Sequence, residues 1–381
     1  MNSNKVLRQI TYEIYKSRPA IPAKMRTNYR IERVNGGFLC DLWFLTQGCR
    51  HDAAGGCVMC NYGKNDGCVE WDRILQELRK VVNELPWEFE DFLLTSSGSL
   101  LDVGEVTPAM RSDLSVLLKP VRTKRFIVET RADTITDSGL AFVKSIMPQA
   151  ETYIEIGVEA SDDWVLKYCV NKGSEFKQFQ NAVKKIHQKG MFVTANIGLG
   201  FPFMSERAAI NCAVRSICDV RKAGADSVVL FPYHIKKGTL LDVMYQNKMY
   251  QCVSLWALVE VLKHFSEEEL KFIQISWYKD YFGEKHSYIY QSPGTCSKCA
   301  KEVMDEMDRY RDRQAFASVR KLTDYPCQCR EEWRKRMLEQ PPEIQIEKVK
   351  EDYRKLAKIY KIDADILEKE FHNMEQEFVR R

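Results

Sequence analysis

The sequence predicts an α/β fold, a partial (β/α)6-type barrel followed by a small helical module that carries cysteines. From residue 38 to about 277, short β-branched or aromatic runs alternate with amphipathic helical segments. Such alternation is typical of βαβ units in a parallel sheet. After residue 280 the pattern changes to a segment rich in Gly, Ser and Cys, and then to charged helices. We therefore divide the chain into a helical lead-in (1–37), a core (38–280) and a C-terminal module (281–381).

The core begins with a strand predicted over 38–45. Further strands are predicted over 91–96, 125–130, 152–158, 191–199, 227–232 and 272–277. Helices are predicted between them over 70–84, 107–118, 136–145, 161–169, 175–188, 205–222 and 253–264. Six or seven such units form either a partial barrel or a doubly wound sheet. In both architectures the site lies at the carboxyl ends of the strands.

The composition limits the class of protein. Hydrophobic residues make up 45% of the 381 residues, which supports a sizeable core, and the net charge of +4 neither demands nor excludes a nucleic-acid partner. No apolar run approaches the roughly 20 residues of a membrane span, and residues 1–25 do not read as a signal peptide. We expect a cytoplasmic protein with no membrane partner, whose 13 cysteines are metal ligands or reduced thiols.

Three of these cysteines lie close together on a glycine-containing loop, directly after the first predicted strand. Their spacing is Cys49-x7-Cys57-x2-Cys60. Cysteine thiolates hold iron–sulfur clusters, and three of them leave one iron of a [4Fe–4S] cluster free to bind a small molecule. The loop follows the carboxyl end of a strand, where the site of this fold class is expected. The sequence therefore predicts an iron–sulfur centre with one open iron.

The loop resembles that of the radical S-adenosylmethionine (SAM) superfamily, and its long first gap is similar to the elongator-type branch. Met59 stands where an aromatic residue is commoner, which is a mild departure. Motifs at the ends of later strands agree with the resemblance: Ser97-Gly98-Ser99, Glu129-Thr130-Arg131-Ala132-Asp133, Glu155-Ile156-Gly157-Val158-Glu159 and Gly198-Leu199-Gly200-Phe201-Pro202. Within the superfamily, the chain most resembles the radical SAM subunit of archaeosine synthase and its uncharacterised relatives.

The resemblance implies a radical enzyme. Cys49, Cys57 and Cys60 would ligate three irons, and SAM would bind the fourth. An electron from an external donor of the flavodoxin or ferredoxin type would cleave SAM, and the resulting radical would abstract a hydrogen atom from the substrate. Residues implied to bind SAM are Gly98 and Ser99 at its amino group, Arg131 at its carboxylate, Glu159 at its amino group or ribose, and Gly198 to Pro202 near its adenine.

The resemblance also implies a substrate, a 7-deazaguanine-type nucleoside in tRNA. The alternative is natural-product biosynthesis on an amino acid, a peptide or another small metabolite. A non-enzymatic zinc scaffold is a third reading, which predicts zinc at every cysteine group and no SAM binding. Candidates for contact with the substrate are His51, Asp52, Tyr62, His234, Lys236, Lys237, Trp277, Tyr278 and Tyr281.

A second cysteine group lies in the C-terminal module, with the pattern Cys296-x2-Cys299 and Cys327-x-Cys329. Four cysteines in two close pairs suit a tetrahedral structural zinc or a second iron–sulfur cluster. Free or redox-active thiols are the remaining alternative. We expect zinc, which would tie a loop to the helical tail.

Overall fold

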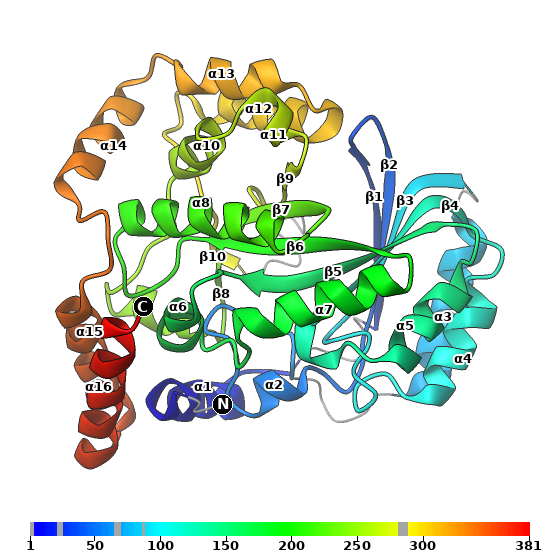
Figure 1. The fold of residues 1–381 in the computed structure, drawn as a ribbon, viewed down its shortest axis with the longest axis horizontal. Coiled ribbons are helices and arrows are strands. Elements are labelled where there is room, and N and C mark those ends of the chain that lie inside the picture. Colours follow the sequence, from blue (N-terminus) through cyan, green and yellow to red (C-terminus); the bar gives the residue numbers. More distant parts are fainter. Residues whose placement is uncertain (1–3, 21–25, 65–69, 86–87, 281–288) are drawn as a thin grey trace.

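We describe residues 4–20, 26–64, 70–85, 88–280 and 289–381 of the protein in a computed structural model. The core is an eight-stranded sheet that curls into a partial barrel, with helices on its outer side (Figure 1). Its strands follow the order β1-β2-β3-β4-β5-β6-β7-β9. A doubly wound sheet needs a reversal of strand order, and this sheet has none. The predicted partial barrel is therefore confirmed.

Every predicted strand is present. The parallel strands are β2 (Gly37–Phe44), β3 (Glu88–Ser96), β4 (Arg122–Thr130), β5 (Glu151–Glu159), β6 (Phe192–Leu199), β7 (Ser227–Pro232) and β9 (Ile273–Ile275). One further strand, β1 (Thr27–Val34), pairs antiparallel with β2 at the edge of the sheet. A separate two-stranded sheet joins β8 (Ile235–Lys236) to β10 (Ile289–Gln291). The sequence analysis did not predict β1, β8 or β10.

The helices that connect the parallel strands also follow the prediction. They are α3 (Trp71–Glu84), α4 (Pro108–Leu117), α5 (Asp137–Ile146), α7 (Phe176–Gln188), α8 (Glu206–Lys222) and α10 (Leu255–Lys263), with the short α2 (Arg50–Ala53), η1 (Ala132–Thr134), α9 (Leu240–Gln246) and α11 (Glu267–Leu270) as additions. Side chains such as Thr107, Thr136 and Ser205 accept hydrogen bonds from the first helical turn and so fix where the helices begin.

One predicted helix, over 161–169, is broken in the structure. It consists of α6 (Asp163–Val165) and a π-helical turn, η2 (Leu166–Val170). The turn ends at Asn171, whose left-handed backbone (φ 55°) is a conformation that asparagine adopts more readily than most residues. The Asn171 side chain donates hydrogen bonds to the carbonyl oxygens of Gly55 and Gly56 at 2.9 and 2.8 Å. This break therefore serves the cysteine loop.

The main core lies between the sheet and the outer helices. Along β2, the side chains of Cys40, Leu42 and Phe44 are fully buried against this layer. Each fully buried side chain of the size of Leu or Phe contributes about 1.5–3 kcal/mol to folding. The opposite face of the sheet lines the lumen, and side chains there, such as Asp41 and Trp43, stay partly exposed.

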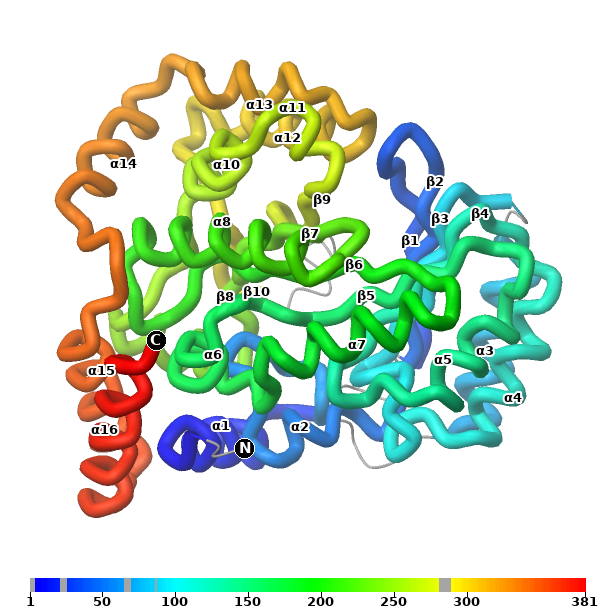
Figure 2. Tube along the Cα trace, viewed as in Figure 1, coloured from blue at the N-terminus to red at the C-terminus, as the bar shows by residue number. Residues whose placement is uncertain are grey.

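The C-terminal module is helical, as predicted. It consists of α12 (Ala300–Arg313), α13 (Phe316–Thr323), α14 (Gln328–Glu339), α15 (Ile346–Tyr360) and α16 (Ala364–Val379). In the described part of the lead-in, α1 (Lys5–Ser17) is helical as predicted, but β1 is a strand, which corrects the helical prediction there. The helix α1 lies beside α15 and α16, so the two ends of the chain meet (Figure 2). Asn4 caps α1 and donates a hydrogen bond to the Tyr353 hydroxyl at 2.7 Å. Within the described ranges, no helix has the length and apolarity needed to cross a membrane.

Candidate functional site

The three-cysteine loop follows the carboxyl end of β2 and packs on α1. Cys49 is the residue before α2. Arg18, just beyond the end of α1, forms a buried ion pair with Asp52 and donates a hydrogen bond to the Cys60 carbonyl at 3.1 Å. Asp52 also accepts a hydrogen bond from the Gly63 amide at 2.9 Å. Asp52, predicted as a substrate contact, is thus a buried anchor of this loop.

The thiols of Cys49, Cys57 and Cys60 lie in one neighbourhood, because the charges of Cys49 and Cys60 act on the pKa of Cys57 and the charge of Cys49 acts on that of Cys60. Burial raises the pKa of Cys57 to about 12 and that of Cys60 to about 11. Such thiols lose their protons readily only when a metal replaces the lost positive charge. All three side chains keep a partly exposed surface. This donor set, three thiols and no fourth cysteine beside them among the described residues, fits a [4Fe–4S] cluster with one open iron.

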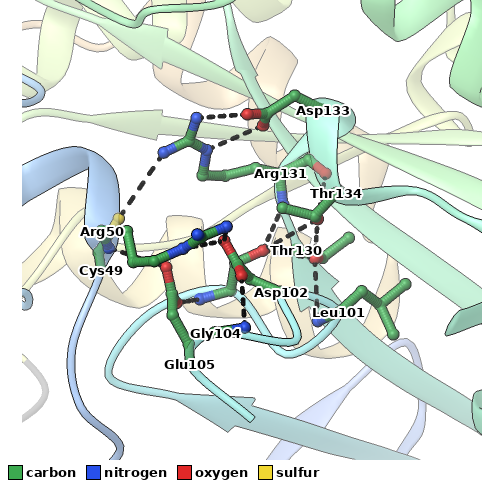
Figure 3. A network of polar contacts seen from close by, with 11 residues as sticks. Cys49, Arg50, Leu101, Asp102, Gly104, Glu105, Thr130, Arg131, Asp133 and Thr134 are labelled. Carbon is green, nitrogen blue, oxygen red and sulfur yellow. Dashed lines mark hydrogen bonds and ion pairs between the residues drawn. The ribbon is translucent and has the colours of Figure 1, made fainter. Parts of the chain in front are cut away.

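The loop after β3 begins with Gly98 and Ser99, and its Asp102 and Glu105 lie beside Cys49 and Arg50 of the cysteine loop (Figure 3). The Glu105 carboxylate joins the two, since it accepts hydrogen bonds from the Arg50 amide at 2.9 Å and from the Ser99 amide. A side chain at Gly98 would collide with Glu105. Arg50 adds a two-point contact with Asp102 at 2.9 and 2.7 Å. The loop predicted to meet the SAM amino group is therefore fixed to the residue that follows Cys49.

Glu105 has a role that the sequence analysis did not assign. Its buried side chain bridges two loops that lie 55 residues apart. The signal available in the sequence was its position shortly after a glycine-containing loop at a strand end. The partner atoms, however, are backbone amides, which no motif reveals.

Arg131, at the end of β4, lies beside the cysteine loop. Its guanidinium group contacts both carboxylate oxygens of Asp133, at 2.9 and 2.6 Å, and one nitrogen lies 3.9 Å from the Cys49 sulfur (Figure 3). Asp133 uses the two-point contact that a carboxylate makes with arginine. The predicted contact of Arg131 with the SAM carboxylate stays a prediction. Such a contact would use the guanidinium N–H groups that Asp133 does not occupy.

Glu159, at the end of β5, is buried and fully engaged. One carboxylate oxygen pairs with the Lys172 ammonium at 2.9 Å, and the other accepts a hydrogen bond from the Tyr233 hydroxyl at 2.9 Å. Its backbone has a positive φ of 70°, which is uncommon for a residue other than glycine. A side chain at Gly198 would collide with the same Tyr233 ring. The predicted roles of Glu159, Gly198 and the buried Pro202 toward SAM stay predictions.

Three of the predicted substrate contacts come together where β7 and β9 end. Lys236, on β8, lies over the ring of Tyr62 at 4.5 Å and over that of Trp277 at 5.6 Å from the ring centres. Its ammonium group also lies 3.3 Å from the Tyr62 hydroxyl oxygen. The structure thus joins candidates from the cysteine loop, from β8 and from the segment after β9.

The two predicted histidines form contacts within the protein. One ring nitrogen of His51 lies 2.9 Å from the Asn171 carbonyl oxygen, and burial lowers the pKa of His51 to about 4. His234 contacts the Ser292 hydroxyl at 2.9 Å, and burial lowers its pKa to about 4 as well. Both rings are therefore neutral at pH 7.

The other predicted substrate contacts lie apart. Tyr278 is fully buried and donates a hydrogen bond to Asp308 on α12 at 2.6 Å. The Lys237 ammonium lies over the Tyr290 ring, 5.1 Å from its centre. Tyr281 lies outside the described residues.

The second cysteine group forms a compact site between α10, α12 and α14. The four sulfurs of Cys296, Cys299, Cys327 and Cys329 lie within 4.8 Å of one another, and neighbouring pairs are 3.3–3.6 Å apart. The Trp256 indole of α10 donates a hydrogen bond to the Cys329 sulfur at 3.4 Å. The structure therefore brings all four predicted ligands together.

Sequence comparisons find relatives of the predicted kind, although no known family profile matches the chain. The chain is 28% identical over 299 residues to archaeosine synthase subunit beta of Methanosarcina acetivorans, covering 77% of this chain and 83% of that protein. It is also 28% identical over 223 residues to the same subunit of Thermococcus kodakarensis, covering 57% and 68%. The predicted resemblance is therefore confirmed.

Solved structures with a related fold include Elp3 of Methanocaldococcus infernus, with a TM-score of 0.45 and 16% identity over 62% of this chain and 57% of that chain. Another is coproporphyrinogen III oxidase of Escherichia coli, described as a radical SAM enzyme, with a TM-score of 0.39 and 12% identity over 69% and 55%. The chain spans less than two thirds of both. The curled parallel sheet and the three-cysteine loop of this chain are the features that its sequence predicts for a radical SAM enzyme.

Proposed function

We propose that this protein is a radical SAM enzyme that modifies a 7-deazaguanine-type nucleoside in tRNA, in the manner of archaeosine synthase. One observation carries the proposal. The loop with Cys49, Cys57 and Cys60 lies at the carboxyl end of β2, and Glu105 fastens it to the Gly98–Ser99 loop. The names of the sequence relatives support the choice of substrate.

The residues of the chain have distinct tasks in this function. Cys49, Cys57 and Cys60 hold a [4Fe–4S] cluster, which when bound supplies the electron that cleaves SAM and starts hydrogen abstraction. Gly98 lets the backbone approach the SAM amino group, because it has no side chain. Arg131 stabilises the thiolate of Cys49 through its positive charge. The barrel wall excludes water from the reacting groups.

The first test is an anaerobic reconstitution of the protein with iron and sulfide. We expect about four irons per chain and 5′-deoxyadenosine when SAM and dithionite are added. Cys57→Ala should lose both, whereas Cys218→Ala, on α8 and away from the loop, should retain both. Iron-free protein that leaves SAM intact would contradict the proposed class and favour the zinc scaffold.

The choice of substrate needs a test of its own. The reconstituted enzyme is incubated with tRNA that carries a 7-deazaguanine-type precursor, and the digested nucleosides are analysed by mass spectrometry. We expect a new nucleoside that is absent with Cys57→Ala. Binding of the tRNA should weaken steeply with added salt, because phosphate contacts release counterions. SAM cleavage that responds to an amino acid or peptide and not to tRNA would favour the natural-product alternative.

We also propose that Cys296, Cys299, Cys327 and Cys329 hold one zinc ion. With zinc–sulfur bonds of about 2.3 Å in a tetrahedron, sulfurs lie about 3.8 Å apart, close to the 3.3–3.6 Å of the neighbouring pairs. In a [4Fe–4S] cluster each thiolate binds a different iron, so its sulfurs lie farther apart than these. Metal analysis should give about one zinc beside the four irons; about eight irons and no zinc would support an auxiliary cluster instead.

A further inference from the structure

The lumen face of the sheet carries polar side chains that the site above leaves unused. Along β4 and β5, fully buried side chains packed on the helices alternate with partly exposed side chains that face the lumen. Glu129 and Glu155 are on this lumen face. Their partial exposure shows that the lumen is not filled by side chains, unlike the interior of a closed barrel.

Glu129 and Glu155 are direct partners in the register between β4 and β5. Side chains of such partners lie about 5 Å apart at Cβ. Glu129 accepts a hydrogen bond from Thr95, and Asn196 donates one to Glu155. Neither glutamate takes part in an ion pair with any residue that the structure describes. Burial and then the charge of Glu129 raise the pKa of Glu155 to about 8, and no cation of the described chain is among the groups that act on Glu155.

The two cations nearest to this pair have other partners. Arg30 forms ion pairs with Asp41 and Glu32, both at 3.0 Å. Lys236 lies against the rings of Tyr62 and Trp277. The charges of Arg30 and Lys236 still act on the pKa of Glu129, so these groups lie near one another on the lumen side of the sheet.

A separate observation points to a missing hydrogen-bond donor. The side-chain oxygen of Asn196 is buried, and it has no partner within the described part of the chain. An unpaired buried acceptor of this kind costs about 1–3 kcal/mol. Two carboxyl groups and one amide oxygen thus face the lumen together. All three accept hydrogen bonds, so a positively charged group with several N–H donors would match them.

This part of the lumen lies near the three-cysteine loop. The charges of Cys60 and Glu159 act on the pKa of Lys236, and Lys236 in turn acts on Glu129. Glu155 lies four residues before Glu159 on the same strand, which is about 13 Å along β5. The two glutamates and the cysteine loop are therefore within the reach of one substrate molecule.

We propose that Glu129 and Glu155 bind a cationic nitrogen group of the substrate, a protonated amine or an amidine. This proposal rests on the proposed function only in taking the lumen as the substrate chamber. An amidinium group presents parallel N–H donors, which match a pair of carboxylates. Tyr62 and Trp277 place aromatic surface at the end of the chamber nearest the cysteine loop, where a planar part of the same substrate stacks.

Calorimetric titration of the reconstituted enzyme with SAM tests this proposal. The probes are benzamidine and its neutral analogue benzamide. We expect benzamidine to bind at least about tenfold more tightly, because its amidinium group forms charge-assisted hydrogen bonds that the neutral amide cannot form. Glu129→Gln and Glu155→Gln should each weaken benzamidine about tenfold or more and leave benzamide unchanged. Glu151→Gln, at the exposed start of β5, is the matched control.

Two outcomes overturn the proposal: benzamidine that binds no better than benzamide, and glutamine variants that bind benzamidine as the unchanged protein does. Thermal unfolding of each variant shows that the fold is kept, so that lost binding is not lost structure. SAM cleavage is measured on the same preparations. If it is absent while benzamidine binding follows the glutamates, the proposed function fails and the cation site stands.

Discussion

The two cysteine groups of this protein differ in a way that separates chemistry from structure. The loop with Cys49, Cys57 and Cys60 offers three free thiols after the carboxyl end of β2, beside a polar lumen. Cys296, Cys299, Cys327 and Cys329 supply four ligands in a compact site between helices, with Cys299 only 1% exposed. A metal site with all its positions filled by protein is structural, whereas an open position allows reaction. We expect the two sites to respond differently to the same kinds of mutation.

The largest expected effect is on stability, at the four-cysteine site. Cys299→Ser should remove zinc and lower the free energy of unfolding by more than about 4 kcal/mol, a range typical of the loss of a metal. The reason is that the metal joins the start of α12 to the start of α14. Metal analysis and chemical denaturation check this. Iron bound at the three-cysteine loop should be unchanged; loss of both metals would contradict the separation of the two sites.

A second prediction concerns how the three-cysteine loop is anchored. The side chains of Arg18 and Asp52 are 4% and 6% exposed. Removing one partner of a buried ion pair costs about 3–5 kcal/mol, so Arg18→Ala should destabilise the protein by about this amount. The matched control is Arg50→Ala on the same loop, whose side chain is 65% exposed and whose pair should be worth at most about 1 kcal/mol. Denaturation curves that show equal losses would mean that α1 does not anchor the loop.

A third prediction tests the link between the cysteine loop and the Gly98–Ser99 loop. In Glu105→Gln one carboxylate oxygen becomes an amide group that cannot accept a hydrogen bond. One backbone amide then loses its partner, which should cost about 1–3 kcal/mol of stability. We also expect weaker SAM binding, measured by equilibrium dialysis. Glu88→Gln, at the exposed start of β3, should change neither quantity. SAM affinity that is unaffected in Glu105→Gln would show that the two loops act independently.

Most of the fold could be predicted from the sequence because the core strands are short runs rich in β-branched or aromatic residues and many are bounded by turn residues. β5, predicted over 152–158, spans Glu151–Glu159, and the predicted group of four C-terminal cysteines does come together. The strand β1 was missed although a signal was present. Asn35-Gly36, both with positive φ, is the dipeptide favoured in two-residue hairpins, and it joins β1 to β2.

The contacts that shape the site could not be predicted in the same way. Glu159 meets Tyr233 across 74 residues, and Glu105 meets Arg50 across 55. Such pairs depend on which strand ends lie side by side, and local patterns contain no information on this. A motif can therefore name Glu159 as a strand-end carboxylate, but only the fold shows that Lys172 and Tyr233 already occupy both its oxygens.

The smallest effect distinguishes the polar lumen beside the three-cysteine loop from the closed four-cysteine site. Burial and the nearby charges of Glu129 and Asp41 raise the pKa of Glu155 above its ordinary value of 4.5. Above pH 4.5 the unfolded chain releases this proton before the folded protein does. The free energy of unfolding therefore falls as pH rises, by at most about 1.4 kcal/mol per pH unit.

Glu155→Gln should remove this pH-dependent loss of stability. In thermal unfolding between pH 5 and pH 8, the stability of Glu155→Gln relative to the unchanged protein should therefore increase as pH rises. The stability of Glu151→Gln should match that of the unchanged protein throughout. A constant difference between Glu155→Gln and the unchanged protein over this range would show that folding does not raise the pKa of Glu155, and the contrast between the two regions would then rest on their cysteines alone.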